Sequence, residues 1–292
     1  MFKQPSNLVV VVLNYNDAPT TIQFIQAHES ISRIDGFIVV DNASTDDSLN
    51  QLKALQSDRL VVLSAAHNGG YAQGNNLGLR YVADVVHAKT VMLANPDTQI
   101  DEAALSACLA HLDEHPQCGL VAPRMMTPKG SERSAWALPT YGHLLVRAFI
   151  PLRPFLNSKA HERVHKAPVQ VVDVLAGSLW IAHTDVLKAV DYFDESTFLY
   201  GEEQILGHKL KAAGYASVVL NTITYRHEHS QSINKSIPSA RRKFELALQS
   251  HQIYLKNYLR VAAWKRTLYT LVYRLNLAVF LGLKWLQSKV TS

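Results

Sequence analysis

The chain has 292 residues, 48% of them hydrophobic, and a formal net charge of +5. This length and composition allow one large α/β domain or two smaller ones, with a sizeable core. Cys108 and Cys118 are the only cysteines and form no close metal-ligand pair, which argues against a disulfide framework and favours a reducing compartment.

The two ends of the sequence bear on where the protein acts. Lys3 is followed by polar residues and then directly by a strand pattern, so the N-terminus does not resemble a signal peptide. No uncharged apolar run reaches the roughly 18–20 residues of a membrane-spanning helix. Much of the positive charge lies toward the C-terminus, which suggests an anionic membrane surface or nucleic acid as partner.

Short apolar runs alternate with helical stretches through residues 1–122. Strands are expected at 8–13, 37–40, 60–63, 90–93 and 119–122. Helices are expected at 20–28, from a Ser44 or Thr45 cap to about residue 55, from the glycine-rich segment 69–76 to about residue 86, and at 101–114. This alternation predicts an α/β fold with a mainly parallel, doubly wound sheet, helices on both faces and right-handed crossovers.

The alternation ends after Pro123. The segment 124–168 is rich in proline, arginine, histidine and isolated aromatic residues, and we expect it to be irregular. The remaining elements are expected as strands at 169–175 and 178–181, a loop at 193–200, a helix at 202–213, extended segments at 218–220 and 224–226, and two helices from residue 239 onward.

Polar side chains follow the predicted strands, so a ligand is expected along one edge of the sheet. The segment 91–97 is the clearest case, because Pro96 stops the strand, and Asn95 and Asp97 point the same way if the backbone is extended. Their oxygens suit a hard divalent cation that bridges a diphosphate, and an ordinary β-turn is the competing interpretation. Neither Gly-x-Gly-x-x-Gly nor a phosphate-loop Gly-Lys-Ser/Thr occurs, which argues against dinucleotide oxidoreductases and P-loop enzymes.

Six motifs in order resemble the inverting family 2 glycosyltransferases of the GT-A fold, and most of all their rhamnosyltransferase-like branch. They are VLNYN at 12–16, VDNASTD at 40–46, NGG at 68–70 with GNN at 74–76, NPD at 95–97, FDE at 193–195 with FLYGEE at 198–203, and HEHS at 227–230. The resemblance runs from residue 8 to 232. It implies a catalytic domain at 1–235, with a nucleotide-binding half at 1–122 and an acceptor half at 123–235, followed by C-terminal amphipathic helices at 236–292.

The resemblance implies a nucleotide-sugar donor bound by residues at the strand ends, namely Asn14, Tyr15, Asn16, Asp41, Asn68, Gly70, Asn75, Asn76 and Asn95. Several of these allow two interpretations. Asp41 could accept the ring N–H of uracil or thymine, or only cap the next helix. Tyr15 could stack on the base or be a half-buried core aromatic. Asn75 and Asn76 could be donor contacts or helix-start residues.

The resemblance also implies a divalent cation, Mg²⁺ or Mn²⁺, with Asp97 as the principal ligand. His227 resembles the histidine that completes the metal site or contacts the diphosphate, and His229 is a weaker candidate for that role. The family usually has two acidic residues at this corner. Asn95 is therefore either a weak, uncharged ligand or a residue that only orients Asp97 or the sugar.

Inverting sugar transfer needs one carboxylate that takes the proton from the attacking hydroxyl. Glu202 and Glu203, at a loop-to-helix junction, are the candidates for this base, unless they only stabilise the N-terminus of the helix. The family commonly has Glu-Asp here, with the Asp as base, and a further acidic residue where this chain has Ile205. The choice between Glu202 and Glu203 therefore stays open, with Glu203 favoured.

Residues 261–289 lie beyond the resemblance and carry a helical stripe at Leu268, Val272, Leu275, Val279, Gly282 and Leu286. Basic residues fall opposite the stripe and aromatic residues flank it: Arg266, Arg274 and Lys284, and Trp264, Tyr269, Tyr273 and Trp285. This pattern predicts a helix that lies on an anionic membrane surface. Packing of the same stripe on the catalytic domain, or on a second subunit of a homo-oligomer, is the alternative.

Together these features predict a cytoplasmic enzyme, peripheral at the inner face of the cell membrane, with no nucleic-acid partner. The resemblance favours rhamnose from dTDP-rhamnose as the transferred sugar, and a saccharide or polyprenyl-diphosphate-linked acceptor in surface-polysaccharide synthesis. A UDP-hexose or galactofuranose donor stays open. Two other classes compete: a catalytically silent nucleotide-sugar-binding subunit, which Glu203 and Ile205 allow, and a sugar-nucleotide pyrophosphorylase, whose glycine-rich N-terminal loop is absent after Leu13.

Overall fold

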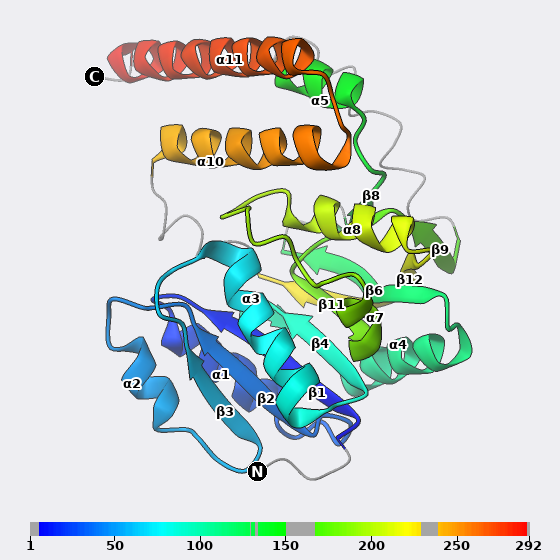
Figure 1. Cartoon of the computed structure of the whole chain (residues 1–292). Helices are drawn as coiled ribbons and strands as arrows, with labels where there is room; N and C mark the ends of the chain where they lie inside the picture. The colour runs from blue at the N-terminus through cyan, green and yellow to red at the C-terminus, as the bar shows by residue number, and fades with distance from the viewer. Residues whose placement is uncertain (1–5, 129, 132–133, 150–166, 229–238, 291–292) are drawn as a thin grey trace.

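The computed structural model describes residues 6–128, 130–131, 134–149, 167–228 and 239–290 (Figure 1). Four parallel strands form its N-terminal part: β1 (Leu8–Asn14), β2 (Gly36–Asp41), β3 (Leu60–Ser64) and β4 (Thr90–Ala94). All of β2 and β4 and most of β1 are buried, as expected for strands that are apolar throughout and covered on both faces. The predicted strands at these four places are confirmed.

The sheet continues through strands of both directions. β11 (Leu179–His183) runs antiparallel between β4 and β6 (Cys118–Thr127), and β12 (Ala216–His227) runs parallel to β6. Three short strands lie at the margin: β5 (Thr98–Gln99) and β9 (Val169–Val172) pair with β12, and β7 (Gly130–Ser131) pairs with β6. Within the described residues the order is β3-β2-β1-β4-β11-β6-β12-β5. Of the longer strands among them only β11 opposes the others, so the predicted α/β fold is confirmed.

Helices cover both faces of the sheet (Figure 1). One face carries α1 (Ala18–His28), α2 (Ser48–Lys53) and α4 (Glu102–Glu114). There Phe24 and Leu105 join a core with Val10 of β1. The other face carries α3 (Gly70–Tyr81) with its continuation η1 (Val82–Val86), α7 (Thr184–Ala189) and α8 (Glu202–Ala212). There Leu79 and Leu206 join a second core.

Three local predictions are wrong. Ser44 and Thr45 do not cap the second helix, which begins at Ser48, because the Ser44 hydroxyl oxygen accepts hydrogen bonds from Asn14 and Asn16 instead. The segment 124–168 is not wholly irregular: β6 continues to Thr127, and β8 (Ala135–Trp136) and α5 (Tyr141–Ala148) follow, while 150–166 lies outside the described residues. The strand expected at 169–175 is two strands, β9 and β10 (Val174–Leu175), in different sheets.

Contacts distant in sequence explain the last of these differences. Asp173 separates β9 from β10 and accepts hydrogen bonds from the Leu138 amide at 2.9 Å and the Lys211 ammonium at 2.7 Å. At this point the chain leaves the edge of the large sheet and pairs with β8. The two extended segments expected at 218–220 and 224–226 are instead one strand, β12, whose register with β6 shifts between Leu220 and Thr224.

The two helices expected after residue 239 form a layer beyond α8. α10 (Ala240–Ile253), continued by η4 (Tyr254–Tyr258), runs antiparallel to α11 (Ala263–Val290) (Figure 1). Leu255 and Tyr269 of this layer form a third core with Leu144 of α5 and Ile205 of α8. None of the helices in the described ranges is long and apolar enough to cross a membrane.

Candidate functional site

Side chains at the strand ends hold together the loops that follow β1 and β2. Asn14 and Asp41 are buried, and the Asn14 amide donates to Asp41 Oδ1 at 2.9 Å and to Ser44 Oγ at 3.2 Å. Ser44 donates from its backbone amide and its hydroxyl to the same carboxylate, at 3.0 and 2.6 Å. Asn14 and Asp41 therefore lie together, as predicted donor residues should, and both are engaged inside the protein. Contact of Asp41 with a nucleobase stays a prediction.

Three further predicted donor residues surround this network. Asn16 has a left-handed φ of 52° and is tied to Thr45: its Oδ1 accepts from the Thr45 amide at 2.7 Å, and its Nδ2 donates to Thr45 Oγ1 at 3.1 Å. Asn68 Oδ1 accepts from the Gly70 amide at 3.0 Å. Tyr15 is half-buried, which leaves both of its interpretations open.

The glycine-rich segment contacts the loop that leads to α8. Gly70 has a φ of 84°, and a Cβ on it would lie 2.0 Å from the Phe198 carbonyl oxygen, so this position requires glycine. Asn75 and Asn76 are buried inside α3 and do not begin it. Asn76 donates to the Phe193 carbonyl and accepts from the Phe193 amide, at 3.0 Å each. In the structure, Asn76 therefore holds this loop.

The corner at Asn95 and Asp97 is a turn. The Thr98 amide donates to the Asn95 carbonyl at 3.2 Å, and the Asn95 amide donates to the Ser178 carbonyl at 2.8 Å. Because Pro96 and Asp97 are in a turn, the expected common direction of the Asn95 and Asp97 side chains does not follow from strand alternation. The turn leads directly into β5, which places Asp97 beside β12.

Asp97 and His227 come together from distant parts of the sequence. His227 pairs with Thr98 across β12 and β5, and its Nε2 lies 3.3 Å from Asp97 Oδ1. Both side chains are largely enclosed, with 15% of Asp97 and 10% of His227 exposed. The other ring nitrogen of His227 lies 3.3 Å from the Met125 sulfur. The two residues predicted as metal ligands are thus brought together.

This donor set fits a divalent cation that shares its shell with phosphate. No group of three or more His, Cys, Asp and Glu side chains suited to metal binding occurs in the part of the chain that the structure describes. Asp97 and His227 supply two ligands, and Mg²⁺ or Mn²⁺ at such a site takes the rest of its shell from phosphate oxygens and water. His229 lies outside the described residues.

Glu202 and Glu203 begin α8 in different surroundings. Glu202 is buried, and its Oε1 has no hydrogen-bond partner among the described residues. Burial, and then the charge of Glu203, raise the pKa of Glu202 to about 8. Glu203 is half-buried. Burial raises the pKa of Glu203 above that of an ordinary carboxyl, and a hydrogen bond from the Gly177 backbone opposes the shift.

Tyr71 lies beside Glu203 at Gly177. Its hydroxyl donates to the Gly177 carbonyl. A Cβ on Gly177 would lie 2.9 Å from Glu203 Oε1 and 3.2 Å from the Tyr71 hydroxyl oxygen. Burial raises the pKa of Tyr71 well above its ordinary value, and the charges of Glu203 and Asp97 add to this rise. Glu203 and Tyr71 therefore meet at Gly177, and the next residue, Ser178, accepts the Asn95 amide of the Asp97 turn.

Sequence reasoning missed Ser178, Tyr225 and Met125. The Ser178 hydroxyl lies 2.6 Å from the Tyr225 hydroxyl and 3.7 Å from the Met125 sulfur. Burial and the nearby Asp97 charge raise the pKa of Tyr225, against a hydrogen bond with Ser178. Tyr225 and His227 are two residues apart in β12 and so share one face of the strand, a signal that could have indicated Tyr225. Met125 lies in a segment that was expected to be irregular.

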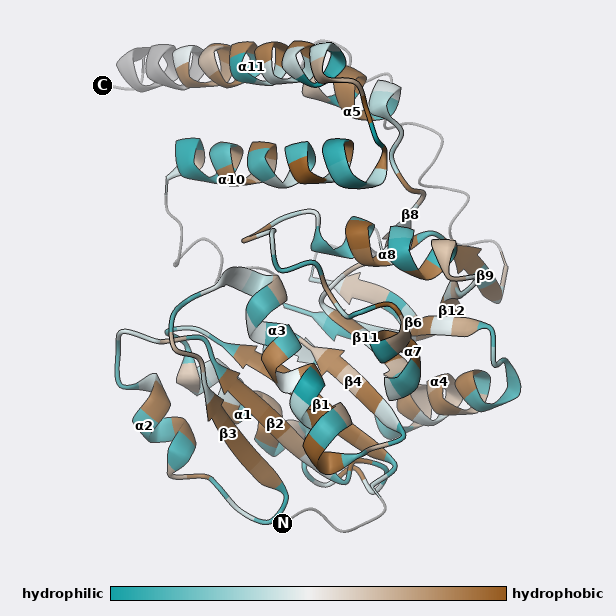
Figure 2. Ribbon diagram, in the orientation of Figure 1, coloured by the Kyte–Doolittle hydropathy of each residue, from teal (hydrophilic) through white to brown (hydrophobic). Residues whose placement is uncertain are grey.

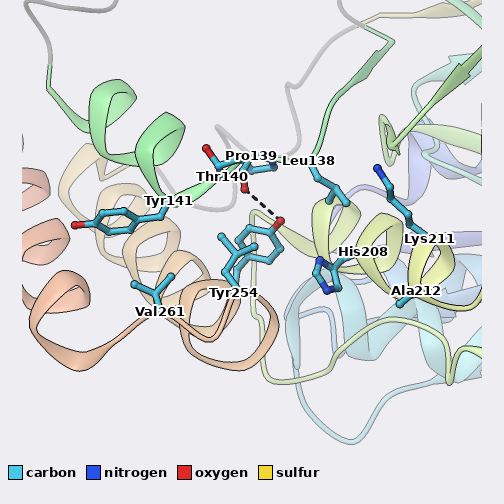
Figure 3. A pocket seen from close by; sticks show the side chains of 10 residues that line it. Leu138, Pro139, Thr140, Tyr141, His208, Lys211, Ala212, Tyr254 and Val261 are labelled. Carbon is cyan, nitrogen blue, oxygen red and sulfur yellow. Dashed lines mark hydrogen bonds between the residues drawn. The ribbon is translucent and has the colours of Figure 1, made fainter.

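A separate cavity of about 460 Å³ lies between the start of α5, the C-terminal half of α8 and η4 (Figure 3). Its lining is mainly apolar, with His208 and Lys211 as basic members. Tyr254 lines it and donates to the Pro139 carbonyl at 3.3 Å. None of the residues predicted for donor, metal or catalysis lines this cavity, so it is distinct from the site around Asp97 and Glu203.

Known proteins resemble this chain over most of its length. The sequence profile of glycosyl transferase family 2 matches residues 9–187, more than half of the chain. A low-salt glycan biosynthesis hexosyltransferase of Haloferax volcanii is 28% identical over 197 residues, 68% of this chain. The chain spans 59% of that relative's length. An N-acetylglucosaminyl-diphospho-decaprenol L-rhamnosyltransferase of Mycobacterium tuberculosis is 25% identical over 241 residues, 78% of each protein.

Solved structures show the same architecture. The structure of GalNAc-T7 with UDP, GalNAc and Mn²⁺ has a TM-score of 0.61 at 12% identity, and covers 88% of this chain and 49% of that one. This likeness shows that the fold is of the GT-A type. With the strand-end residues, the Asp97 corner and Gly177 all inside the matched segment, the chain belongs to glycosyl transferase family 2.

Proposed function

We propose that this protein is an inverting glycosyltransferase of the rhamnosyltransferase-like branch, with Glu203 as the base and Asp97 and His227 at the donor diphosphate. The observation that carries the proposal is the geometry at Gly177 and Ser178. Glu203 and Tyr71 both approach Gly177, the Asn95 amide of the Asp97 turn donates to the Ser178 carbonyl, and His227 lies 3.3 Å from Asp97. Inverting transfer needs a carboxylate on the acceptor side and positive charge at the leaving diphosphate, and this arrangement supports both.

Glu203 suits the role of base. It is more exposed than the buried Glu202, so its carboxylate is the one of the pair that an acceptor hydroxyl can reach. The Gly177 backbone and the first turn of α8 hold the carboxylate in place. In the reaction, the acceptor hydroxyl gives its proton to Glu203, and its oxygen forms a bond to the anomeric carbon. The bond from that carbon to the diphosphate oxygen breaks on the opposite side, which inverts the centre.

Glu202 suits a different role. It is 2% exposed, and its pKa of about 8 keeps the carboxyl protonated at neutral pH. A protonated, enclosed carboxyl cannot take a proton from an acceptor hydroxyl. We therefore assign to Glu202 the ordering of the start of α8, which supports Glu203 as the base.

Asp97 and His227 would hold the divalent cation. When bound there, Mg²⁺ or Mn²⁺ would supply positive charge to the leaving diphosphate. The turn closed by the Thr98 amide fixes the backbone of Asp97, and pairing of β12 with β5 brings His227 to it. The Mn²⁺ in the GalNAc-T7 structure supports this assignment by analogy of fold.

The relatives bear on the donor and the acceptor. The similar mycobacterial protein is named as a rhamnosyltransferase acting on a decaprenyl-diphosphate-linked sugar, which supports rhamnose from dTDP-rhamnose and a polyprenyl-diphosphate-linked acceptor here. The Haloferax relative is named only as a hexosyltransferase, and GalNAc-T7 holds UDP. A UDP-hexose or galactofuranose donor is therefore the second candidate.

We also propose that α11 lies on the membrane that carries this acceptor. Val272 of the stripe predicted from the sequence, and Tyr269 that flanks it, pack into the C-terminal core. Hydrophobic residues recur along α11 (Figure 2), and several of them are exposed, three of which belong to the predicted stripe. The exposed ones recur at spacings of three and four and are 41–66% exposed: Trp264, Leu268, Leu271, Leu275 and Val279. One face of α11 thus binds protein and another is available to lipid.

The test is a transfer assay with purified protein, a panel of nucleotide sugars and an N-acetylglucosamine-diphosphate-polyprenol acceptor, with and without Mn²⁺. We expect dTDP-rhamnose to give the fastest transfer and chelation to stop it. Faster transfer from a UDP-hexose would replace the donor assignment. Nucleotide binding with no transfer from any donor would favour a silent binding subunit.

A further inference from the structure

The loop 193–201, which leads into Glu202 and Glu203, is held from two sides. On the first side are residues of α3: Asn76 donates to Glu195 Oε1 at 2.9 Å, and Arg80 lies 2.5 Å from the same oxygen. The Tyr71 amide donates to the Phe198 carbonyl at 2.9 Å. These contacts tie the loop to the nucleotide-binding half of the molecule.

The second side is provided by the C-terminal helices. The Tyr258 hydroxyl of η4 donates to Asp194 Oδ2 at 2.6 Å. The Ser250 hydroxyl of α10 donates to the Leu199 carbonyl at 3.0 Å, and Ser250 is buried. Both contacts join residues more than fifty positions apart in the sequence, so they anchor the loop to an element distant from it along the chain.

The backbone at the end of this loop adopts a left-handed conformation. Tyr200 has a φ of 71° and Gly201 a φ of 92°, and a left-handed conformation is unfavourable for a residue other than glycine. Such a conformation persists only where surrounding contacts enforce it. The Leu199 carbonyl held by Ser250 is next to Tyr200, and Ile205 of the following helix packs in the C-terminal core. The C-terminal helices therefore contact the chain both before Glu203, at Leu199, and after it, at Ile205.

We infer that Tyr258 and Ser250 are positioning residues for sugar transfer, which hold the loop 193–201 so that Glu203 stays against Gly177. This rests on the proposed role of Glu203 as base. The inference assigns to the C-terminal helices a part in catalysis in addition to any contact with lipid. An acceptor anchored at α11 and the base in α8 would then be held by one rigid unit.

The charges at Asp194 agree with this role. Burial raises the pKa of Asp194, but hydrogen bonds from Ser196 and Tyr258, and the Lys209 charge, hold it below its ordinary value. The carboxylate is therefore ionised at neutral pH and makes a charge-assisted hydrogen bond with Tyr258, which is stronger than a neutral one. Lys209 also donates to the Tyr192 carbonyl at 2.8 Å, which ties α8 to the start of the loop.

The test compares two Tyr→Phe variants of the same short helix. Tyr258→Phe removes the hydroxyl that binds Asp194, whereas Tyr254→Phe removes the one that binds Pro139 at the cavity of Figure 3. We expect Tyr258→Phe to lower kcat by about 10-fold or more, since small misplacement of a catalytic group has effects of this size. Donor Kd should change less than about twofold, because no donor residue is touched. Tyr254→Phe should leave kcat within about twofold.

A second readout does not depend on activity. Hydrogen exchange of the peptide covering 194–203 should quicken in Tyr258→Phe and in Ser250→Ala, and stay unchanged in Tyr254→Phe. Asp194→Asn, which keeps an acceptor oxygen, should retain more turnover than Asp194→Ala. Equal kcat and equal exchange in Tyr258→Phe and Tyr254→Phe would overturn the inference. If instead Glu203→Gln retained full turnover while the exchange difference persisted, the proposed base would be wrong and the anchoring of the loop would stand.

Discussion

Asp41 and Asp97 both follow buried strands, yet their surroundings differ. Asp41 is fully buried, and its carboxylate accepts hydrogen bonds from Asn14 and Ser44. Asp97 keeps part of its side chain exposed and lies beside the imidazole of His227. Loss of the Asp41 carboxylate should therefore disorder the loops after β1 and β2, whereas loss of the Asp97 charge should act on ligand binding.

Asp97→Asn tests the metal assignment, because it keeps the shape of the side chain and removes its charge. We expect the affinity for dTDP or UDP in the presence of Mn²⁺ to fall by about 10-fold or more, the scale seen when a metal site is disturbed. Titration calorimetry with and without Mn²⁺ measures this. Glu228→Gln is the matched control, since Glu228 is the exposed neighbour of His227. Equal, metal-dependent affinities in wild type and Asp97→Asn would contradict the assignment.

At the scale of single elements, α3 and the loop 193–201 meet at a position without room for a side chain. Gly70→Ala would place a Cβ 2.0 Å from the Phe198 carbonyl, whereas Gly214→Ala, at the same φ of 84°, meets nothing within 4 Å. We expect Gly214→Ala to lower the free energy of unfolding by about 1–2 kcal/mol, the cost of left-handed backbone. Gly70→Ala should cost more, because the loop must also move. Urea unfolding of both variants measures the difference, and equal losses would contradict the close approach.

The exposed apolar face of α11 is predicted to bind anionic membranes. Leu271→Glu with Leu275→Glu places two charges on that face and leaves the buried face intact, so binding to anionic vesicles should be lost. The control is the same change at Leu55 and Val85, which are exposed far from α11 in sequence. Flotation of the wild type should weaken in high salt without vanishing, since exposed basic residues add about 1 kcal/mol each and apolar insertion is insensitive to salt. Wild type that never floats with anionic vesicles would contradict this role.

The elements also show what the sequence could and could not indicate. β1, β2 and β4 are predictable because a strand buried on both faces is apolar throughout. The division of 169–175 into two strands is not, because it depends on bonds from Leu138 and Lys211 to Asp173. The Ser44 cap failed for the same reason, since the Ser44 hydroxyl oxygen accepts hydrogen bonds from Asn14 and Asn16, which are distant in the sequence.

At the scale of the whole molecule, the sequence predicts which residues belong to the site better than it predicts which of them lie together. Asp97 and His227 were expected to act together, and they lie 3.3 Å apart. The arrangement of Glu203, Gly177 and Tyr71 depends on the antiparallel strand β11, which brings Gly177 between α3 and α8. No local pattern of residues encodes that contact.

Buried His28 and half-buried His251, in separate parts of the molecule, make its stability depend on pH. Burial lowers the pKa of His28, and lowers the pKa of His251 to about 4. The unfolded chain, with histidine pKa values near 6.5, binds more protons than the folded one between these values. Stability is therefore fully present above about pH 6.5 and is lost as the pH falls toward 4.

The His251→Phe variant tests this linkage. It removes the hydrogen bond between His251 and the Tyr269 hydroxyl, so the melting temperature at pH 7.5 should fall. The further drop between pH 7.5 and pH 5 should be smaller than in the wild type. Exposed His67 replaced by Phe is the control, with an unchanged drop. Scanning calorimetry at the two pH values measures both, and an equal drop in all three proteins would contradict the linkage.

The central claim is that Glu203 takes the proton in an inverting transfer. The most direct measurement is single-turnover transfer by Glu203→Gln and Glu202→Gln with saturating nucleotide sugar and lipid-linked acceptor, with the anomeric configuration of the product read by NMR. We expect an inverted product, a rate lowered by about 10²-fold or more in Glu203→Gln with donor binding retained, and a much smaller effect in Glu202→Gln. A retained anomeric configuration, or near-normal transfer by Glu203→Gln, would contradict the account.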